Sequence, residues 1–114
     1  MNYLFLDNGF EEIEAITTID LLRRANISVT TVSVTGNPMV LGAHNIAVEA
    51  DGLIERIDFS DAEMLILPGG QTKLGECSAL CDLLIEHNKA ENHRCSANSR
   101  NRFIGFVMFY QQVT

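Results

Sequence analysis

The stretch Ala62-Glu63-Met64-Leu65-Ile66-Leu67-Pro68-Gly69-Gly70 has the pattern of a buried parallel strand that opens into a turn facing a ligand. In open α/β sheets, ligands bind in the crevice beyond the carboxyl ends of the strands. Gly69 and Gly70 have no Cβ, so their backbone N–H groups can closely approach a bound anion or a developing oxyanion. A tight turn without a ligand is the alternative interpretation of the Gly-Gly pair.

The composition is that of a globular protein with an acidic surface. The chain has 114 residues, of which 46% are hydrophobic, a mean hydropathy of +0.09 and a formal net charge of −7 at pH 7. We expect one domain or part of one, and the negative charge argues against nucleic acid or anionic membranes as partners. The sequence has no export signal and no apolar run of the roughly 20 residues that span a membrane. This predicts a soluble, cytoplasmic protein with reduced cysteines.

The sequence before this stretch predicts a β-α-β unit. Residues 3–6 and 27–34 are apolar or β-branched runs that indicate strands, and residues 8–25 between them have helical periodicity. Asn8 is expected to cap this helix, with Glu11 completing a capping box. An apolar face should pack on the sheet, and it comprises Ile13, Ile16, Ile19 and Leu22.

Other segments also have recognisable patterns. Residues 39–41 and 46–50 flank a turn and are expected to pair as a hairpin, followed by a helical turn near residues 53–57. Residues 76–89 predict a second helix, with one side formed by Leu80, Leu83, Leu84 and His87. Residues 91–102 are polar and rich in turn formers, so no central strand is expected there. The sheet edge beside the Pro-Gly-Gly strand should then be unpaired, which invites dimerisation or aggregation.

Three segments carry a family resemblance. They are the helix Gly9-Phe10-Glu11-Glu12-Ile13-Glu14-Ala15-Ile16-Thr17-Thr18-Ile19-Asp20-Leu21-Leu22-Arg23-Arg24-Ala25, the strand Ile27-Ser28-Val29-Thr30-Thr31-Val32, and Met64-Leu65-Ile66-Leu67-Pro68-Gly69-Gly70. Over about residues 2–90 the chain resembles the amino-terminal half of the ThiJ/PfpI family, the superfamily of the Parkinsonism-associated protein deglycase. The resemblance implies a flavodoxin-like α/β fold, a three-layer sandwich with a mostly parallel sheet, truncated after the second major helix.

The resemblance also implies a nucleophilic cysteine on a strained strand-to-helix elbow. In the family, the third glutamate of the helix motif, here Glu14, contacts this cysteine, and the turn glycines, here Gly69 and Gly70, face the same pocket. A carboxyl shielded from water favours its neutral form and can donate a hydrogen bond that keeps a thiolate nucleophilic. Cys95 lies near the expected distance after the helix and is the candidate nucleophile. Without the resemblance, Glu14 would be interpreted as a solvated helix residue.

The chain departs from the family pattern around Cys95. The family has an elbow of the type Ala-Ile-Cys-Ala-x-Pro, whereas His93 and Arg94 precede this cysteine, and polar residues do not suit the buried end of a central strand. The family's carboxyl-terminal half, with further strands and often a pocket histidine, has no counterpart in this chain.

A change of reading frame after about Ala90 is one hypothesis for this departure. Codons for residues 91–95, read one base later, can spell Lys-Ile-Ile-Ala-Ala, a strand of the family type. We therefore divide the chain into an incomplete ThiJ/PfpI-like domain, residues 1–90, and a divergent tail, residues 91–114. The apolar run at residues 103–110 would then be a fortuitous strand or an exposed, aggregation-prone segment.

Three functions are compatible with these observations. The first is the family chemistry of cysteine-dependent attack on reactive carbonyls, as in glyoxalase or protein deglycase activity, or peptidase-like hydrolysis. Glu14 would tune Cys95, and the N–H groups of Gly69 and Gly70 would stabilise the oxyanion. The second is a non-catalytic family fragment, and the third a chaperone-like or redox-sensing binding protein. The expected ligand is a small reactive carbonyl or glycated substrate without a cofactor. Family members often dimerise, so a homodimer is a further expectation.

No metal site is expected. Cys77, Cys81, His87, His93 and Cys95 lack the close cysteine pairs of structural zinc sites, so the helical thiols are expected to pack as small hydrophobic groups. His44 lies in the predicted hairpin turn and is interpreted as a surface residue rather than a catalytic base.

Overall fold

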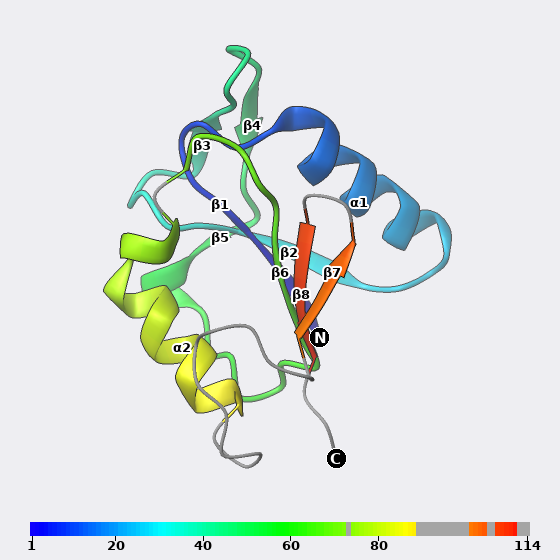
Figure 1. The fold of residues 1–114 in the computed structure, drawn as a ribbon, viewed down its shortest axis with the longest axis vertical. Coiled ribbons are helices and arrows are strands. Elements are labelled where there is room, and N and C mark those ends of the chain that lie inside the picture. The colour runs from blue at the N-terminus through cyan, green and yellow to red at the C-terminus, as the bar shows by residue number, and fades with distance from the viewer. Residues whose placement is uncertain (73, 89–100, 105–106, 112–114) are drawn as a thin grey trace.

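The sheet is organised around its first strand, β1 (Asn2–Leu6), in the computed structural model (Figure 1). The structure describes residues 1–72, 74–88, 101–104 and 107–111. β1 pairs in parallel with β2 (Val29–Ser33) on one side and with β6 (Met64–Leu67) on the other. The short strand β5 (Gly52–Leu53) continues the sheet in parallel beyond β2. The predicted parallel strand before Pro-Gly-Gly is thus confirmed, because β6 pairs in parallel with β1.

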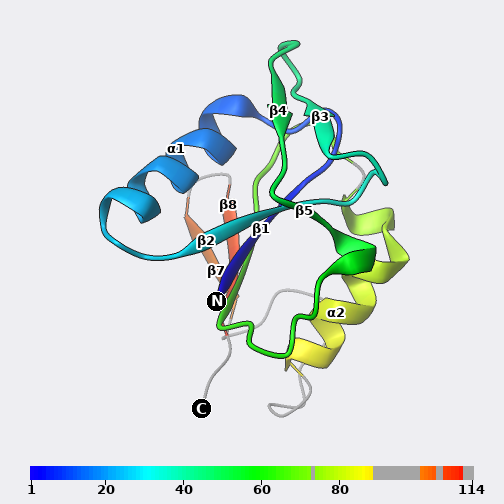
Figure 2. The same cartoon turned by 180° about the vertical axis from the view of Figure 1, so that it is seen from behind.

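Two helices, α1 (Glu12–Arg24) and α2 (Ser78–Asn88), cover opposite faces of the sheet (Figures 1 and 2). Successive side chains of a strand point to opposite faces, and β1 supplies both cores in this way. Leu4 and Leu6 are buried in the core that includes α1 residues. Tyr3 and Phe5 are buried in the core that includes α2 residues. The result is a three-layer α/β sandwich with a mostly parallel sheet, which confirms the predicted fold class.

A hairpin stands outside the main sheet, beyond the carboxyl end of β1 (Figure 1). It consists of β3 (Met39–Leu41) and β4 (Ala47–Glu49), which pair antiparallel and confirm the predicted hairpin. The 3-10 turn η1 (Ile54–Arg56) matches the predicted helical turn, and η2 (Leu74–Glu76) leads into α2. In the described part of the chain, neither helix combines the length and apolar content needed to cross a membrane.

Helix α1 begins later than the sequence indicates, and the predicted capping box is wrong. Glu11 is the N-cap residue and makes no capping hydrogen bond with its side chain. The Asn8 side-chain oxygen instead accepts a hydrogen bond from the backbone N–H of Leu41, at 3.0 Å. Asn8 therefore fastens the loop after β1 to the hairpin rather than starting the helix.

The predicted apolar face of α1 is only partly correct. Ile19 is buried, but Ile13 is 73% exposed and Ile16 is 40% exposed. Residues spaced by three drift around a helix with 3.6 residues per turn, so a strict three-residue repeat cannot keep to one side. The buried residues of the helix are Glu12, Ala15 and Ile19, which follow the 3-and-4 spacing of one face.

The described part of the tail forms two strands, β7 (Asn101–Ile104) and β8 (Val107–Gln111). β8 pairs antiparallel with β6, and β7 pairs with β8, which gives the sheet order β5-β2-β1-β6-β8-β7. The expectation that the edge beside β6 is unpaired is therefore wrong, because β8 occupies it.

Candidate functional site

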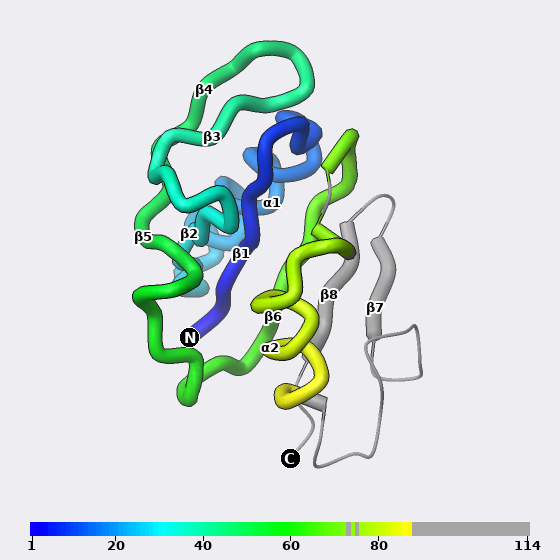
Figure 3. Tube along the Cα trace, turned by 90° about the vertical axis from the view of Figure 1, so that its left-hand side faces the viewer, coloured from blue at the N-terminus to red at the C-terminus, as the bar shows by residue number. Residues whose placement is uncertain are grey.

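The candidate site lies where the chain leaves the carboxyl ends of β1 and β6 (Figure 3). Two backbone hydrogen bonds join the loop after β1 to the turn after β6. Glu11 N–H donates to Gly69 O at 3.0 Å, and Gln71 N–H donates to Gly9 O at 2.8 Å. Phe10 and Gly70 form an isolated antiparallel bridge between these bonds. This is the sheet edge at which the sequence predicts ligand binding.

Gly70 occupies a position that only glycine can take. Its φ is +121°, and a Cβ there would lie 2.5 Å from Gly9 O and 2.6 Å from Glu11 N. Both are backbone atoms, which cannot rotate away as a side chain can. The Gly70 N–H donates no hydrogen bond to any described residue. Among the described residues, no acceptor competes with a ligand oxygen for this N–H.

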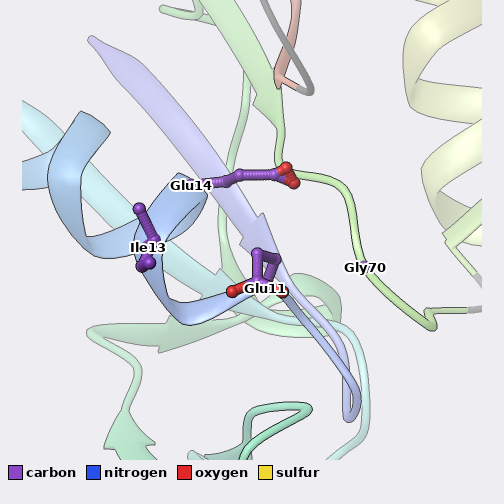
Figure 4. A pocket seen from close by; sticks show the side chains of 4 residues that line it. All are labelled: Glu11, Ile13, Glu14 and Gly70. Atoms are coloured by element: carbon purple, nitrogen blue, oxygen red, sulfur yellow. The ribbon is translucent and has the colours of Figure 1, made fainter.

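A pocket of about 340 Å³ opens at this junction and is lined by Glu11, Ile13, Glu14 and Gly70 (Figure 4). The Glu14 side chain extends from α1 toward the segment that carries Gly70. Within the described residues, the buried Oε2 atom of Glu14 has no hydrogen-bond partner. The pocket therefore holds one carboxyl oxygen whose hydrogen-bonding capacity is unused.

The electrostatic environment of Glu14 favours its neutral form. Burial raises the pKa of Glu14 above its ordinary value of 4.5, and the negative charge of Glu11 raises it further. A backbone hydrogen bond from Gly69 acts in the opposite direction but does not cancel these effects. A protonated carboxyl is a hydrogen-bond donor as well as an acceptor. The raised pKa shifts Glu14 toward its protonated, donating form, and Glu14 lines the same small pocket as Gly70.

Glu12 fastens the hairpin to the start of α1. Its side chain is 6% exposed, and its carboxylate accepts hydrogen bonds from the backbone N–H of His44 at 2.7 Å and of Ile46 at 3.3 Å. The His44 ring Nδ1 lies 2.9 Å from the other carboxylate oxygen. Burial opposes ionisation, but these hydrogen bonds lower the pKa of Glu12 to about 2. The hydrogen bond to Glu12 in turn raises the pKa of His44.

This role of Glu12 is absent from the sequence prediction, although a signal for it exists. Glu12 stands three residues before Ala15 and seven before Ile19, which places it on the buried face of the helix. A charged residue on such a face needs partners, and the hairpin turn supplies them. His44 itself is exposed, as predicted.

Glu11, Glu12 and His44 form the one group of three potential metal ligands in the described part of the chain. One ligand-type atom from each lies within 4.8 Å of the others. Hydrogen bonds from the hairpin occupy both oxygens of Glu12, so these bonds account for the arrangement without a cation. Of the cysteines considered in the sequence, Cys77 packs against the core on the α2 face and Cys81 is half-buried.

The structure therefore brings Glu14 and Gly70 into one pocket, whereas Gly69 is not among its described lining residues and instead forms a backbone hydrogen bond with Glu14. Cys95 and His93 lie outside the described residues, so a contact between Cys95 and Glu14 stays a prediction.

Comparison with known proteins gives one consistent result. The sequence profile of the DJ-1/PfpI family matches residues 2–97. Protein dj-1beta of Drosophila melanogaster is 32% identical over 84 residues, which cover 71% of this chain and 45% of that protein. DJ-1 homolog A of Arabidopsis thaliana is 30% identical over 93 residues, which cover 76% of this chain and 24% of that protein.

Solved structures show the same similarity. Toxoplasma gondii DJ-1, described as oxidized, superimposes with a TM-score of 0.74 at 29% identity, covering 78% of this chain and 50% of that chain. Drosophila melanogaster DJ-1beta gives a TM-score of 0.73 at 29% identity, with the same coverage of 78% and 50%. The chain thus spans half the length, or less, of these relatives. The similarity supports the flavodoxin-like type of sandwich that the sequence predicts.

Proposed function

This chain belongs to the DJ-1/PfpI family, and from that membership we propose that its pocket binds a small reactive carbonyl compound for attack by a cysteine thiolate. Glu14 and Gly70 are the described residues that would contact this ligand, and Cys95 would supply the thiolate. The observation that carries the proposal is the presence, in one pocket, of a buried carboxyl oxygen without a partner and a backbone N–H without an acceptor among the described residues.

In the proposed step, the sulfur of Cys95 forms a bond to the carbonyl carbon, and the π electron pair of the C=O bond moves to the oxygen. The Gly70 N–H donates a hydrogen bond to this developing oxyanion. A proton from water then neutralises the alkoxide and leaves a hemithioacetal. Such an addition fits the glyoxalase and protein deglycase chemistry that the family resemblance implies.

The proposed role of Glu14 follows from its raised pKa. A carboxyl that keeps its proton beside a sulfur atom donates a hydrogen bond to the thiolate and lowers the pKa of the thiol. The sulfur then stays nucleophilic near neutral pH. Cys95 is the proposed partner, and it lies within residues 2–97, the region that matches the family profile.

Turnover of methylglyoxal by the wild-type chain, Cys95→Ser and the matched control Cys77→Ser tests the proposal. We expect turnover by the wild type, its loss in Cys95→Ser and its retention in Cys77→Ser, because Cys77 packs against the core on the α2 face. Equal turnover by the wild type and Cys95→Ser would contradict the proposal. Absence of turnover in the wild type would contradict it as well.

A second candidate function is redox sensing through an oxidisable thiol. It is favoured by the description of the Toxoplasma gondii neighbour as oxidized. A sulfenic acid at Cys95 would react with dimedone after brief exposure to peroxide. Labelling at Cys95 without methylglyoxal turnover would support this function over the first.

A further inference from the structure

Among the described residues, the charged groups that line the pocket are all acidic. Its described lining consists of Glu11, Ile13, Glu14 and Gly70, of which two are glutamates and none is basic. The Glu11 side chain is 28% exposed, so its carboxylate faces both the pocket and solvent. Figure 4 shows the Glu11 side chain at the start of α1, where it lines the pocket. A ligand that enters the pocket therefore meets this carboxylate.

His44 is the nearest described cation to Glu11, and it does not neutralise the group. Its Nδ1 atom lies 3.7 Å from Glu11 Oε1 but 2.9 Å from Glu12 Oε1. A protonated His44 supplies one positive charge against the two carboxylates of Glu11 and Glu12. The cluster thus keeps a net negative charge next to the pocket, and the chain as a whole carries −7.

Glu14 and Glu11 have different chemical roles in this arrangement. Glu14 is half-buried, its buried Oε2 atom has no hydrogen-bond partner among the described residues, and burial raises its pKa. Glu11 is 28% exposed and carries its carboxylate at the pocket, where its negative charge raises the pKa of Glu14. A ligand carboxylate would be repelled by Glu11, whereas a neutral carbonyl would be unaffected and an ammonium group would be attracted.

We infer that Glu11 is a specificity-determining residue that makes the pocket select neutral or amine-bearing carbonyl compounds and reject α-keto acids. This inference rests on the proposed function for its carbonyl ligand, and it adds the charge class of that ligand. Glycated amines and small neutral dicarbonyls belong to the accepted class, and carboxylate-bearing carbonyls to the rejected one.

The test measures binding by NMR and does not depend on turnover. The Gly70 amide and the Ile13 methyl signals report on the pocket, and the probes are hydroxyacetone (neutral), aminoacetone (cationic) and pyruvate (anionic). In the wild type we expect aminoacetone to bind at least as tightly as hydroxyacetone, and pyruvate to bind about tenfold more weakly. In Glu11→Gln, pyruvate should bind nearly as tightly as hydroxyacetone.

The matched control is Glu55→Gln, which removes one negative charge from an exposed position on η1, away from the pocket. It should leave the preference for hydroxyacetone over pyruvate unchanged. Added salt should weaken the preference in the wild type, and this second measurement needs no variant.

A preference that survives in Glu11→Gln, or that salt does not change, would overturn the inference while leaving carbonyl binding intact. Binding with the expected charge preference but without methylglyoxal turnover would support the inference and count against catalysis alone. If none of the three probes shifts the Gly70 or Ile13 signals, the pocket does not bind this class, and the inference fails together with the proposed ligand.

Discussion

Gly70→Ala should destabilise the fold strongly, because this glycine lets two loops meet. An alanine Cβ would lie 2.5 Å from Gly9 O, 2.6 Å from Glu11 N and 2.9 Å from Phe10 C, all of them backbone atoms. The backbone at φ +121° also disfavours any residue with a Cβ, at a cost of about 1–3 kcal/mol. To relieve the clash, the turn after β6 must move away from the loop after β1.

That movement breaks the two hydrogen bonds between the loops, the one from Glu11 N–H to Gly69 O and the one from Gln71 N–H to Gly9 O. Each contributes about 1 kcal/mol to stability. Together with the backbone strain, we expect the free energy of unfolding to fall by about 3–5 kcal/mol. Urea denaturation followed by circular dichroism measures this change.

Gly36→Ala is the matched control for the close approach. Gly36 also has a positive φ, +86°, but a Cβ there would meet no atom within 4 Å. Only backbone strain remains, so we expect a loss of about 1–2 kcal/mol. If both variants lose the same stability, the contact between the loops contributes nothing, and the reasoning that places Gly70 at a structural junction is refuted.

Three further predictions concern the core and the titrating groups. Ile66 on β6 is fully buried, so Ile66→Ala should lower the free energy of unfolding by about 2–5 kcal/mol. Ile13 is 73% exposed, so Ile13→Ala should change it by less than about 0.5 kcal/mol. Equal losses in denaturation experiments would contradict these two burial assignments. The pKa of Glu12 is lowered from 4.5 to about 2, so the stability that its ionised form contributes should be lost as pH falls from about 4.5 towards 2. The pKa of His44 is raised from 6.5, so the stability that its protonated form contributes should be lost as pH rises above 6.5. In Glu12→Gln, denaturation midpoints should lose the dependence below pH 4.5 and show a weaker one above pH 6.5, because Glu11 also raises the pKa of His44; an unchanged profile would count against the pair. Glu14 should titrate above 4.5 in a carboxyl ¹³C NMR experiment. Because a raised folded-state pKa means that the ionised form destabilises the fold, Glu14→Gln should be at least as stable as the wild type at neutral pH. A pKa below 4.5, or a less stable variant, would argue against a raised pKa of Glu14.

The strands could be predicted from the sequence because their local signals agree with their tertiary environment. Met64–Leu67 is an uninterrupted apolar run, and a strand covered by helices on both faces needs such a run. The alternating Val29–Ser33 segment and the hairpin around Gly42 have equally direct signals. In each case burial and backbone propensity favour the same conformation.

The start of α1 could not be predicted because a distant contact decides it. Asn8 followed by Glu11 is a good local capping box, but Gly9, at φ +91°, turns the chain so that Phe10 pairs with Gly70. The Asn8 side chain then meets Leu41, more than thirty residues later. A local pattern contains no information about such a partner.

The candidate site was predictable only in part, for a similar reason. The resemblance identified Glu14 and the glycines, because these positions stand in recognisable motifs. The neighbouring contact between Glu12 and His44 forms only when the hairpin folds onto α1. No short motif connects these two residues, so only the buried spacing of Glu12 with Ala15 and Ile19 could have indicated the contact.

The pairing of β1 with strands from both directions of the chain has a consequence for biosynthesis. β1 is made before β6, so Asn2 finds its partner Met64 only after that later segment has left the ribosome. Until then, one edge of an apolar strand has no neighbour on that side, which is a hazard for aggregation. Contacts of such long sequence separation also slow folding. We therefore expect the nascent chain to depend on molecular chaperones until β6 is complete. A ribosome-bound chain that ends before Met64 should be captured by chaperones more strongly than one that extends well beyond Gly70.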